Sequence, residues 1–331
     1  MDRWIAPSDE NLIEGRAVAV IGYGNQGRPH ALNLRDSGAK VVVGVREGGP
    51  SATRARADGL AVKDIGDAAA EAEFVMVATP DESMAELFTA RIAPRLSAGQ
   101  ILLFAHGFNV HFGFISPPNF VDVGLVSPKG AGVWVRRSFE EGGGLPAMVA
   151  VHQDATGRAW ERVQAYASGI GSARAGLLKT TFREETECDL FGEQAVLCGG
   201  IPAIIRAGYQ TLVEAGYSPE AAWFETVYEA KLIVDLLLAK GERGMAEAIS
   251  NTAEFGGELA ADLLVGEASR ERMRGILERI QSGEFAKQWM SEASTWHPSR
   301  SATTDAVRIE VLGRVPSLRA RLGAEARSNQ P

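Results

Sequence analysis

The segment Ala17-Val-Ala-Val-Ile21-Gly22-Tyr23-Gly24-Asn25-Gln26-Gly27 decides the fold of the first half of the chain. Its first five residues are all apolar and favour a buried β-strand, and its last six form a Gly-x-Gly-x-x-Gly pattern that precedes a helical stretch. The first glycine permits a tight turn, the second admits a pyrophosphate close to the backbone, and the third lets the helix pack on the strand. The helix N-terminus favours phosphate. This segment predicts dinucleotide binding, and a glycine-rich turn without a ligand is the alternative.

Similar apolar runs alternate with helical stretches through the rest of the first half. We expect strands at Ala17–Ile21, Val41–Val45, Phe74–Ala78, Ile101–Phe104, Val121–Val126 and Ala147–Val151. Because these runs are continuous rather than alternating, they indicate a parallel sheet that is buried on both faces. Repeated strand–helix units predict a doubly wound α/β domain of the Rossmann type, which we place at residues 1–181.

From residue 182 onward we expect no strand, because helical patterns dominate. The expected helical segments are Cys188–Leu197, Ile201–Ala215, Pro219–Ala239, Arg243–Phe255, Ser269–Ser282 and Glu284–Ser294. They predict an all-α second domain over residues 182–327.

Composition excludes several kinds of partner. The 331 residues carry 34 Lys+Arg against 42 Asp+Glu, a net charge of −8 that disfavours nucleic acid. No apolar run approaches the roughly 20 residues of a membrane span, and the N-terminus lacks the layout of a signal peptide. The only cysteines, Cys188 and Cys198, would lie about 15 Å apart on one helix, too far for a disulfide. We therefore expect a cytoplasmic protein.

The residues after the second expected strand indicate which dinucleotide binds. NAD-binding proteins often carry an acidic residue here, which contacts the ribose 2′-hydroxyl. This chain has Arg46 instead, whose guanidinium group can pair with a 2′-phosphate, and Ser51 can add a hydroxyl donor. These residues favour NADPH. NADH stays possible because Glu47 could turn inward, and a solvated Arg46 is the other alternative.

Two carboxylate pairs mark the helical half. Asp189 and Glu193, and likewise Glu225 and Glu229, are spaced i,i+4 and therefore share a helix face. Apolar residues continue both faces, which predicts that the faces point inward. Oxygen donors without Cys or His suit Mg²⁺ or Mn²⁺, and four carboxylates could hold two ions. Solvated acidic edges or salt bridges to Arg and Lys are the alternatives.

Three further polar residues have candidate roles. His106 and Lys129 follow the fourth and fifth expected strands, and the carboxyl ends of strands face the ligand crevice in open α/β sheets. A structural role is the alternative for both. Ser250 follows a helical stretch, where it either caps a helix or contacts a substrate.

Together these motifs resemble class I, short-chain ketol-acid reductoisomerases, and the resemblance runs from about residue 10 to 293. The segments that carry it are Val20–Gly27, Asp36–Gly48, Pro80–Glu82, Phe104–Asn109, Pro128–Gly130, Ala150–Ala155, Thr181–Cys198, Lys231–Asp235 and Ile249–Glu254. The resemblance implies conversion of 2-acetolactate or its ethyl homologue into 2,3-dihydroxy acids, within valine, leucine and isoleucine biosynthesis. It also implies a knotted helical C-terminal domain.

The resemblance assigns roles to individual residues. Asp189, Glu193, Glu225 and Glu229 match the ligands of two Mg²⁺ ions, and the second pair comes from the partner subunit of a homodimer. Ser250 matches the substrate-binding serine, while His106, Lys129 and Glu229 occupy catalytic positions. The positions that match cofactor contacts are Gly22, Tyr23, Gly24, Asn25, Gln26, Gly27, Arg46, Ser51, Asp81, Glu82, Ser83, Met84 and Gly132.

Several positions depart from the family pattern without removing a ligand. They are Asn25, Gly49, Ala131, Val133, Tyr228 and Met245–Ala248. These departures leave open a paralogue that reduces a related 2-keto acid or imine in specialised metabolism. A metal-independent reductase and a nucleotide-binding protein without activity are further alternatives.

Overall fold

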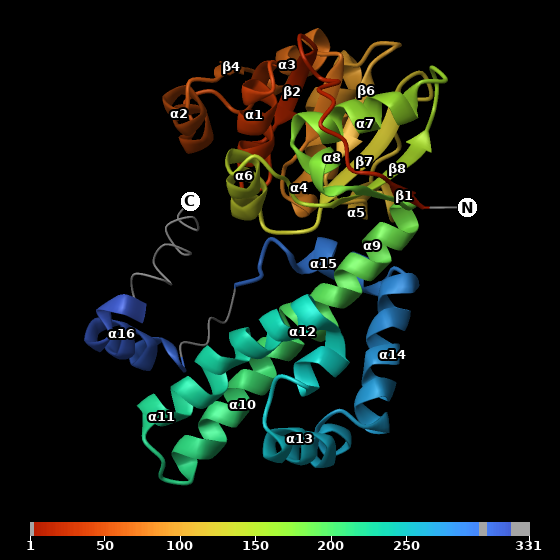
Figure 1. Ribbon diagram of the computed structural model, residues 1–331. Coiled ribbons are helices and arrows are strands. Elements are labelled where there is room, and N and C mark those ends of the chain that lie inside the picture. The colour runs from red at the N-terminus through yellow and green to blue at the C-terminus, as the bar shows by residue number, and fades with distance from the viewer. Residues whose placement is uncertain (1–2, 298–302, 319–331) are drawn as a thin grey trace. The chain divides into compact units, whose positions relative to one another are not determined.

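The computed structural model describes residues 3–297 and 303–318. The chain divides into two compact units, and the division falls between Thr186 and Glu187. The first unit is an α/β unit and the second is helical (Figure 1). Helix α9, Phe182–Phe191, runs across the division.

The first unit is built on one nine-stranded sheet with the order β1-β9-β8-β7-β6-β5-β2-β3-β4. All six predicted strands are present, with ends that differ by at most a few residues. The strands are β1 Trp4–Ile5, β2 Ala17–Ile21, β3 Lys40–Gly44, β4 Ala61–Lys63, β5 Phe74–Val77, β6 Ile101–Phe104, β7 Asp122–Pro128, β8 Ala147–Gln153 and β9 Leu177–Lys179. The three strands that were not predicted, β1, β4 and β9, are two or three residues long, too short to form an apolar run.

The sheet is mixed, which corrects the expectation of a wholly parallel one. Neighbouring strands from β4 to β7 are parallel, but β8 runs antiparallel to β7 and β1 runs antiparallel to β9. The sequence did not reveal this because β7 and β8 are also joined through a helix, α6. A strand–helix–strand pattern occurs in the sequence whether the two strands pair parallel or antiparallel. A strand that is buried on both faces is continuously apolar in both cases.

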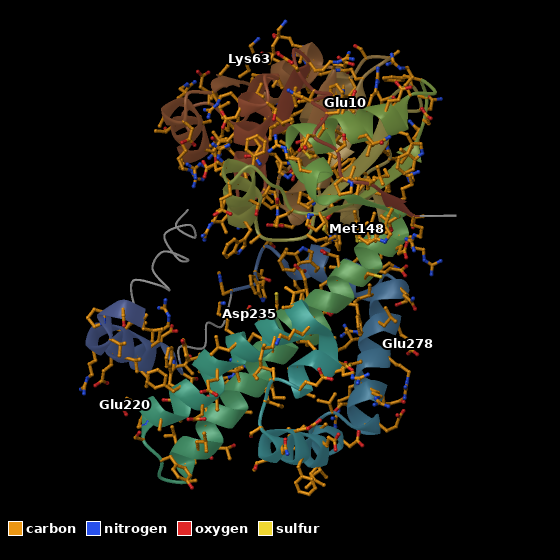
Figure 2. All side chains as sticks on the ribbon, in the orientation of Figure 1. Glu10, Lys63, Met148, Glu220, Asp235 and Glu278 are labelled. Carbon is orange, nitrogen blue, oxygen red and sulfur yellow. The ribbon has the colours of Figure 1, made fainter. Side chains whose placement is uncertain are left out.

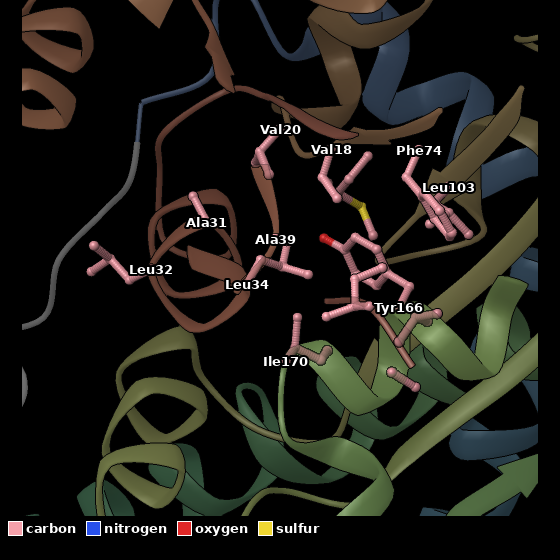
Figure 3. Packing of buried hydrophobic residues seen from close by; sticks show 14 of the residues in the cluster. Val18, Val20, Ala31, Leu32, Leu34, Ala39, Phe74, Leu103, Tyr166 and Ile170 are labelled. Carbon is pink, nitrogen blue, oxygen red and sulfur yellow. The ribbon is translucent and has the colours of Figure 1, made fainter. Parts of the chain in front are cut away.

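Helices cover both faces of the sheet. They are α1 Gly27–Asp36, α2 Pro50–Ala57, α3 Ile65–Glu71, α4 Asp81–Leu87, η1 Phe88–Ile92, η2 Ala93–Arg95, α5 Phe108–His111, α6 Gly132–Glu140, α7 Ala159–Gly169 and α8 Ser172–Ala175. Along β2, Val18 and Val20 pack with α1 and α7 on one face, while Ala19 and Ile21 pack with α3 on the other. Tyr166 lies among the apolar side chains of the first cluster (Figure 3). Burial on both faces explains why these strands are continuously apolar.

The second unit contains helices and, among its described residues, no strand. The elements from residue 192 onward are η3 Gly192–Leu197, α10 Gly200–Glu214, α11 Pro219–Trp223, η4 Phe224–Tyr228, α12 Glu229–Ala246, α13 Asn251–Leu264, α14 Glu267–Gln281, α15 Glu284–Glu292 and α16 Asp305–Arg314. The expected helix Arg243–Phe255 is wrong, because α12 ends at Ala246 and α13 begins only after Ser250. The knot stays a prediction.

Much of the second unit is exposed in the single chain. A small core surrounds Tyr209 and Trp223, but α12 and α13 contain no buried residue. Charged side chains such as Asp235 and Glu278 project from this unit (Figure 2). One continuous helical run, Phe182–Glu214, is long and apolar enough to cross a membrane by length and composition, and 11% of its most apolar window is buried. The sequence alone did not predict this run, because no uninterrupted apolar stretch marks it.

Candidate functional site

The first unit has a cavity of about 770 Å³ at the carboxyl ends of β2, β3, β5 and β6. This is the crevice in which open α/β sheets bind their ligands. Its lining includes most of the predicted cofactor residues: Gly22, Tyr23, Gly24, Asn25, Gln26, Arg46, Ser51, Asp81, Ser83 and Met84. His106, which was predicted as a catalytic residue, also lines it. The predicted residues Gly27, Glu82 and Gly132 are not part of the lining.

The three glycines of the turn fit a dinucleotide for three different reasons. Gly22 has φ +99°, and a Cβ atom there would lie 2.6 Å from the carbonyl oxygen of Ala78. A Cβ on Gly27 would lie 2.3 Å from the carbonyl oxygen of Gly22, so this glycine lets α1 pack against the turn. A Cβ on Gly24 would meet no atom within 4 Å. The space beside Gly24 is therefore open, as the approach of a pyrophosphate requires.

Gly132 lies behind the glycine turn rather than in the cavity wall. It begins α6, and a Cβ atom at this position would lie 1.6 Å from the carbonyl oxygen of Asn25. Gln26 reaches the same loop, because its Nε2 donates to the carbonyl oxygen of Gly130 at 3.2 Å. The loop that contains Gly132 thus supports the turn through backbone contact.

Arg46 and Ser51 line the part of the cavity nearest β3 and the start of α2. Glu47 does not turn inward: its carboxylate pairs with Arg56 at 3.3 Å, and its side chain is 85% exposed. The inward Glu47 that would favour NADH is therefore not observed. In this structure the cavity wall presents a guanidinium group and a hydroxyl where the adenosine ribose of a dinucleotide would lie.

Tyr23 also belongs to a partly buried network that the sequence did not reveal. Its hydroxyl donates to Asp58 at 2.7 Å, and Arg28 donates to the same carboxylate at 2.8 Å. Burial and the neighbouring Asp58 raise the pKa of Tyr23 well above its usual value, so this phenol stays protonated. Asp58 follows the last residue of α2, so the network ties α2 to the glycine turn and to α1.

A buried carboxylate, Glu185 of α9, joins the two polar residues predicted after the fourth and fifth strands. His106 Nδ1 lies 3.2 Å from Glu185 Oε2, and Lys129 Nζ donates to Oε1 at 2.9 Å. The Ser127 hydroxyl donates to Oε1 at 2.8 Å, and the Gly107 amide donates to Oε2 at 3.1 Å. Glu185 itself is fully buried. His106 and Lys129 are therefore held by one shared anion.

The environment keeps Glu185 ionised. Burial alone would raise its pKa, but hydrogen bonds and charge interactions with His106 and Lys129 outweigh burial and lower the pKa to about 2. Glu185 was not among the predicted site residues, because a lone glutamate in an acidic stretch has no distinctive spacing. Its position four residues before Asp189, on the same face of α9, was the available signal.

The predicted metal ligands all lie at or next to π-helical turns. Glu193 lies in η3, which follows the Asp189 turn of α9, and Glu225 lies in η4, which ends just before Glu229. π-Helical turns interrupt α-helices mostly at functional sites, and their i→i+5 bonding changes the angle between side chains spaced i,i+4. The sequence did not predict either turn.

The faces that carry these ligands do not point inward, contrary to the prediction. Val196 and Leu197 beyond the first pair are 43% and 58% exposed, and Leu232 and Ile233 beyond the second are 42% and 41% exposed. In the described part of this chain, no three of the four predicted ligands come together in one cluster. The apolar residues therefore mark a surface, which is uncovered in one chain.

Ser250 is the N-cap residue of α13. Its hydroxyl accepts a hydrogen bond from the Ala253 amide at 3.2 Å. The helix-capping alternative is thus observed, and it leaves the hydroxyl able to donate to a substrate.

The doubly wound sheet, the glycine turn and the cavity at the strand ends define a dinucleotide-binding protein of the Rossmann type. Comparison with known sequences then gives the family. Residues 12–176 match the NADPH-binding domain of acetohydroxy acid isomeroreductase, and residues 182–315 match the C-terminal domain of ketol-acid reductoisomerase. The chain belongs to the ketol-acid reductoisomerase family.

Solved structures agree with this assignment. An NADH-preferring ketol-acid reductoisomerase from an uncultured archaean is 41% identical, with a TM-score of 0.82 over 97% of this chain and 96% of that chain. A putative oxidoreductase from Jannaschia sp. CCS1 is 15% identical, with a TM-score of 0.62 over 81% of this chain and 98% of that chain. A 1-pyrroline-5-carboxylate reductase from Streptococcus pyogenes is 14% identical, with a TM-score of 0.54 over 81% and 99%. The last two share the fold only.

Proposed function

We propose that this chain converts 2-acetolactate and its ethyl homologue into 2,3-dihydroxy acids, by alkyl migration followed by reduction with a nicotinamide cofactor. The observation that carries the proposal is the Glu185 cluster. It places His106, which lines the dinucleotide cavity, and Lys129 on one buried carboxylate in a chain of this family.

The residues of the cluster have distinct tasks in this proposal. Lys129 presents a cation that can hold the carboxylate or developing alkoxide of the substrate, and Glu185 keeps that cation in place. His106, oriented through its Nδ1 by Glu185, can hold or pass a proton at Nε2. Ser127 fixes the Glu185 oxygen that Lys129 also contacts.

We further propose that Asp189 and Glu193 hold Mg²⁺ together with Glu225 and Glu229 of a second subunit. Carboxylate oxygens without Cys or His form the donor set that Mg²⁺ prefers. When bound, the ions would act as Lewis acids that polarise the substrate ketone and lower the pKa of its hydroxyl. The two exposed apolar faces support a shared site, because a second copy would cover the apolar residues that follow each ligand pair.

A homodimer is supported by the helices of the second unit themselves. Leu238 of α12 and Leu263 of α13 are 88% and 86% exposed, and neither helix buries a residue within the single chain. Large apolar side chains that are exposed in such number along two neighbouring stretches of the chain support an interaction site. The apolar run Phe182–Glu214 is explained in the same way, as a surface that a second subunit covers.

For the cofactor, we propose NADPH. Arg46 and Ser51 in the cavity wall and the outward Glu47 support this preference. NADH is the alternative, because the 41% identical relative is NADH-preferring. We also propose a cytoplasmic location, where a reductase of this kind meets reduced nicotinamide.

Oxidation of NADPH with 2-acetolactate, with and without Mg²⁺, tests the activity. We expect turnover only with Mg²⁺. Asp189→Asn should abolish turnover, since an amide is a weaker ligand for a hard cation. An already isomerised 3-hydroxy-2-keto acid serves as the control substrate, because its reduction needs no alkyl migration. Turnover of 2-keto acids or imines with neither acetohydroxy acid accepted would instead identify a paralogous reductase.

A mixed-dimer experiment tests the shared site. Asp189→Asn and Glu229→Gln chains should each be inactive alone. After subunit exchange, each hybrid dimer has one site with both lesions and one site with neither, so activity should return. Exchange is verified by mass spectrometry of differently tagged chains, and no recovery after verified exchange would contradict a site shared between subunits.

A further inference from the structure

A buried amide links the first turns of two helices, α4 and α5, at one end of the dinucleotide cavity. Asn109 lies in α5, just after the loop that contains His106, and it is 1% exposed. Its Nδ2 donates to the backbone oxygen of Asp81 at 3.1 Å and to Asp81 Oδ1 at 3.2 Å. Asp81, the first residue of α4, lines the cavity, whereas Asn109 does not. Asn109 Nδ2 also lies 3.6 Å from Met84 Sδ, and Met84 lines the cavity too, so Asn109 reaches a ligand indirectly, through Asp81 and Met84.

The orientation of this amide is determined by its partners. Both atoms of Asp81 that it contacts are oxygens, so only the NH₂ group of Asn109 can face them. The opposite atom, Asn109 Oδ1, is buried and has no hydrogen-bond partner among the described residues. A buried acceptor without a partner costs free energy. The contact with Asp81 is thus maintained despite a locally unfavourable environment.

The position of Asp81 identifies the part of the ligand that it meets. The glycine turn receives the pyrophosphate, and Arg46 with Ser51 lies on the β3 side, where the adenosine binds. The wall formed after β5 and β6, with Asp81 and His106, is on the other side of the turn. The nicotinamide half of a bound dinucleotide must extend toward this wall.

We propose that Asn109 is a positioning residue for the nicotinamide half of the cofactor, because it fixes the Asp81 side chain in the cavity wall beside His106. The proposal rests on the proposed nicotinamide-dependent function and adds a residue that neither touches the cavity nor carries a charge. Burial raises the pKa of Asp81, while the charge of His106 and the hydrogen bond from Asn109 act in the opposite direction. Asn109 thus also favours the ionised, hydrogen-bond-accepting form of Asp81.

Two ligands that differ only in the nicotinamide test this role. NADP⁺ and its nicotinamide-free fragment, 2′-phospho-ADP-ribose, are titrated calorimetrically into the full-length protein; NAD⁺ and ADP-ribose form a second pair. Asn109→Ala should raise the Kd of NADP⁺ about tenfold and that of the fragment less than about twofold, since the hydrogen bonds that hold Asp81 beside the nicotinamide are lost and the pyrophosphate and adenosine contacts are not. Asn33→Ala is the matched control, because Asn33 is also fully buried and its Nδ2 donates to the carbonyl oxygens of Val135 and Ile170, both at 3.1 Å.

A double-mutant comparison separates positioning from general damage. Asp81→Ala should show the same nicotinamide-selective loss, and adding Asn109→Ala to it should cause no further loss if Asn109 acts through Asp81. This comparison keeps the test decisive if Asn109→Ala alone folds poorly, because Asp81 is only half-buried at the start of α4 and Asn109→Asp supplies a substitution of the same shape. Equal weakening of both ligands, as in the control, would overturn the proposal. Failure of the unmodified protein to bind either ligand would instead contradict the proposed function.

Discussion

The glycine turn allows a prediction in which two similar substitutions have opposite consequences. Gly24→Ala adds a methyl group that meets no protein atom within 4 Å, and Gly24 does not have a positive φ. The free energy of unfolding should therefore stay the same or rise by about 0.4–1 kcal/mol, because alanine restricts the unfolded chain. The methyl group nevertheless occupies the space through which a pyrophosphate approaches the backbone. We expect the Kd of NADPH to rise at least about tenfold, a loss of roughly 1.4 kcal/mol of binding free energy.

Gly27→Ala is the matched control. Its Cβ would lie 2.3 Å from the carbonyl oxygen of Gly22, about 1 Å closer than ordinary van der Waals contact permits. Either α1 or the turn must move, and such overpacking typically costs about 1–3 kcal/mol of stability. This variant should lose stability and cofactor binding together, whereas Gly24→Ala should lose binding alone.

Urea unfolding followed by circular dichroism measures stability without ligand, and the enhancement of NADPH fluorescence on binding measures affinity. Together the two assays give the free energy of unfolding and the NADPH affinity of each variant. Unchanged NADPH affinity in Gly24→Ala would refute the assignment of this turn to the pyrophosphate. A loss of stability in Gly24→Ala as large as that in Gly27→Ala would refute the packing argument.

Three further outcomes are expected. Arg46→Asp should raise the KM for NADPH at least about tenfold and that for NADH much less, because a repelling charge replaces a phosphate partner; equal changes would show that Arg46 does not contact the 2′-phosphate. Glu185→Gln should lower the free energy of unfolding by about 3 kcal/mol at pH 7, since it leaves Lys129 facing a neutral group, and Ser127→Ala should cost only about 1 kcal/mol in the same urea titration. Burial lowers the pKa of His30 from 6.5 to about 4, so the stability that its neutral form contributes is present above pH 6.5 and is lost as the pH falls toward 4. Between pH 7 and pH 5 the free energy of unfolding should therefore fall by about 2 kcal/mol. In His30→Gln, the free energy of unfolding should depend less steeply on pH over this range.

The sequence predicted the first unit well, because its signals are local. The run Ala17–Ile21 and the glycine pattern after it specify strand, turn and helix within eleven residues, and the cavity lies where that pattern predicts. The expected direction of β8 was wrong for a physical reason. Whether β8 pairs parallel or antiparallel with β7 depends on the path of the segment that joins them. The residues of a strand that is buried on both faces are apolar in either case and do not reveal the pairing direction.

The second unit shows the opposite limitation. A helical period locates an apolar face but cannot distinguish a face buried within one chain from a face covered by another. Val196, Leu197 and Leu232 were therefore predicted to point inward, yet they are exposed here. The π-helical turns η3 and η4 escaped prediction because their single extra residue per turn leaves almost no trace in a period measured over a whole helix.

Glu185 explains why site residues and structural residues are hard to separate in this protein. It is fully buried and ionised, so it needs compensating donors, and it finds them in His106, Lys129, Ser127 and the Gly107 amide. The same contacts that make burial of the charge tolerable also orient the histidine and the lysine at the ends of two adjacent strands. Because the donors come from the β6 and β7 ends and the carboxylate comes from α9, the cluster exists only after the sheet and the helix have formed. The geometry of this cluster is therefore a property of the tertiary structure, which no single motif of the sequence contains.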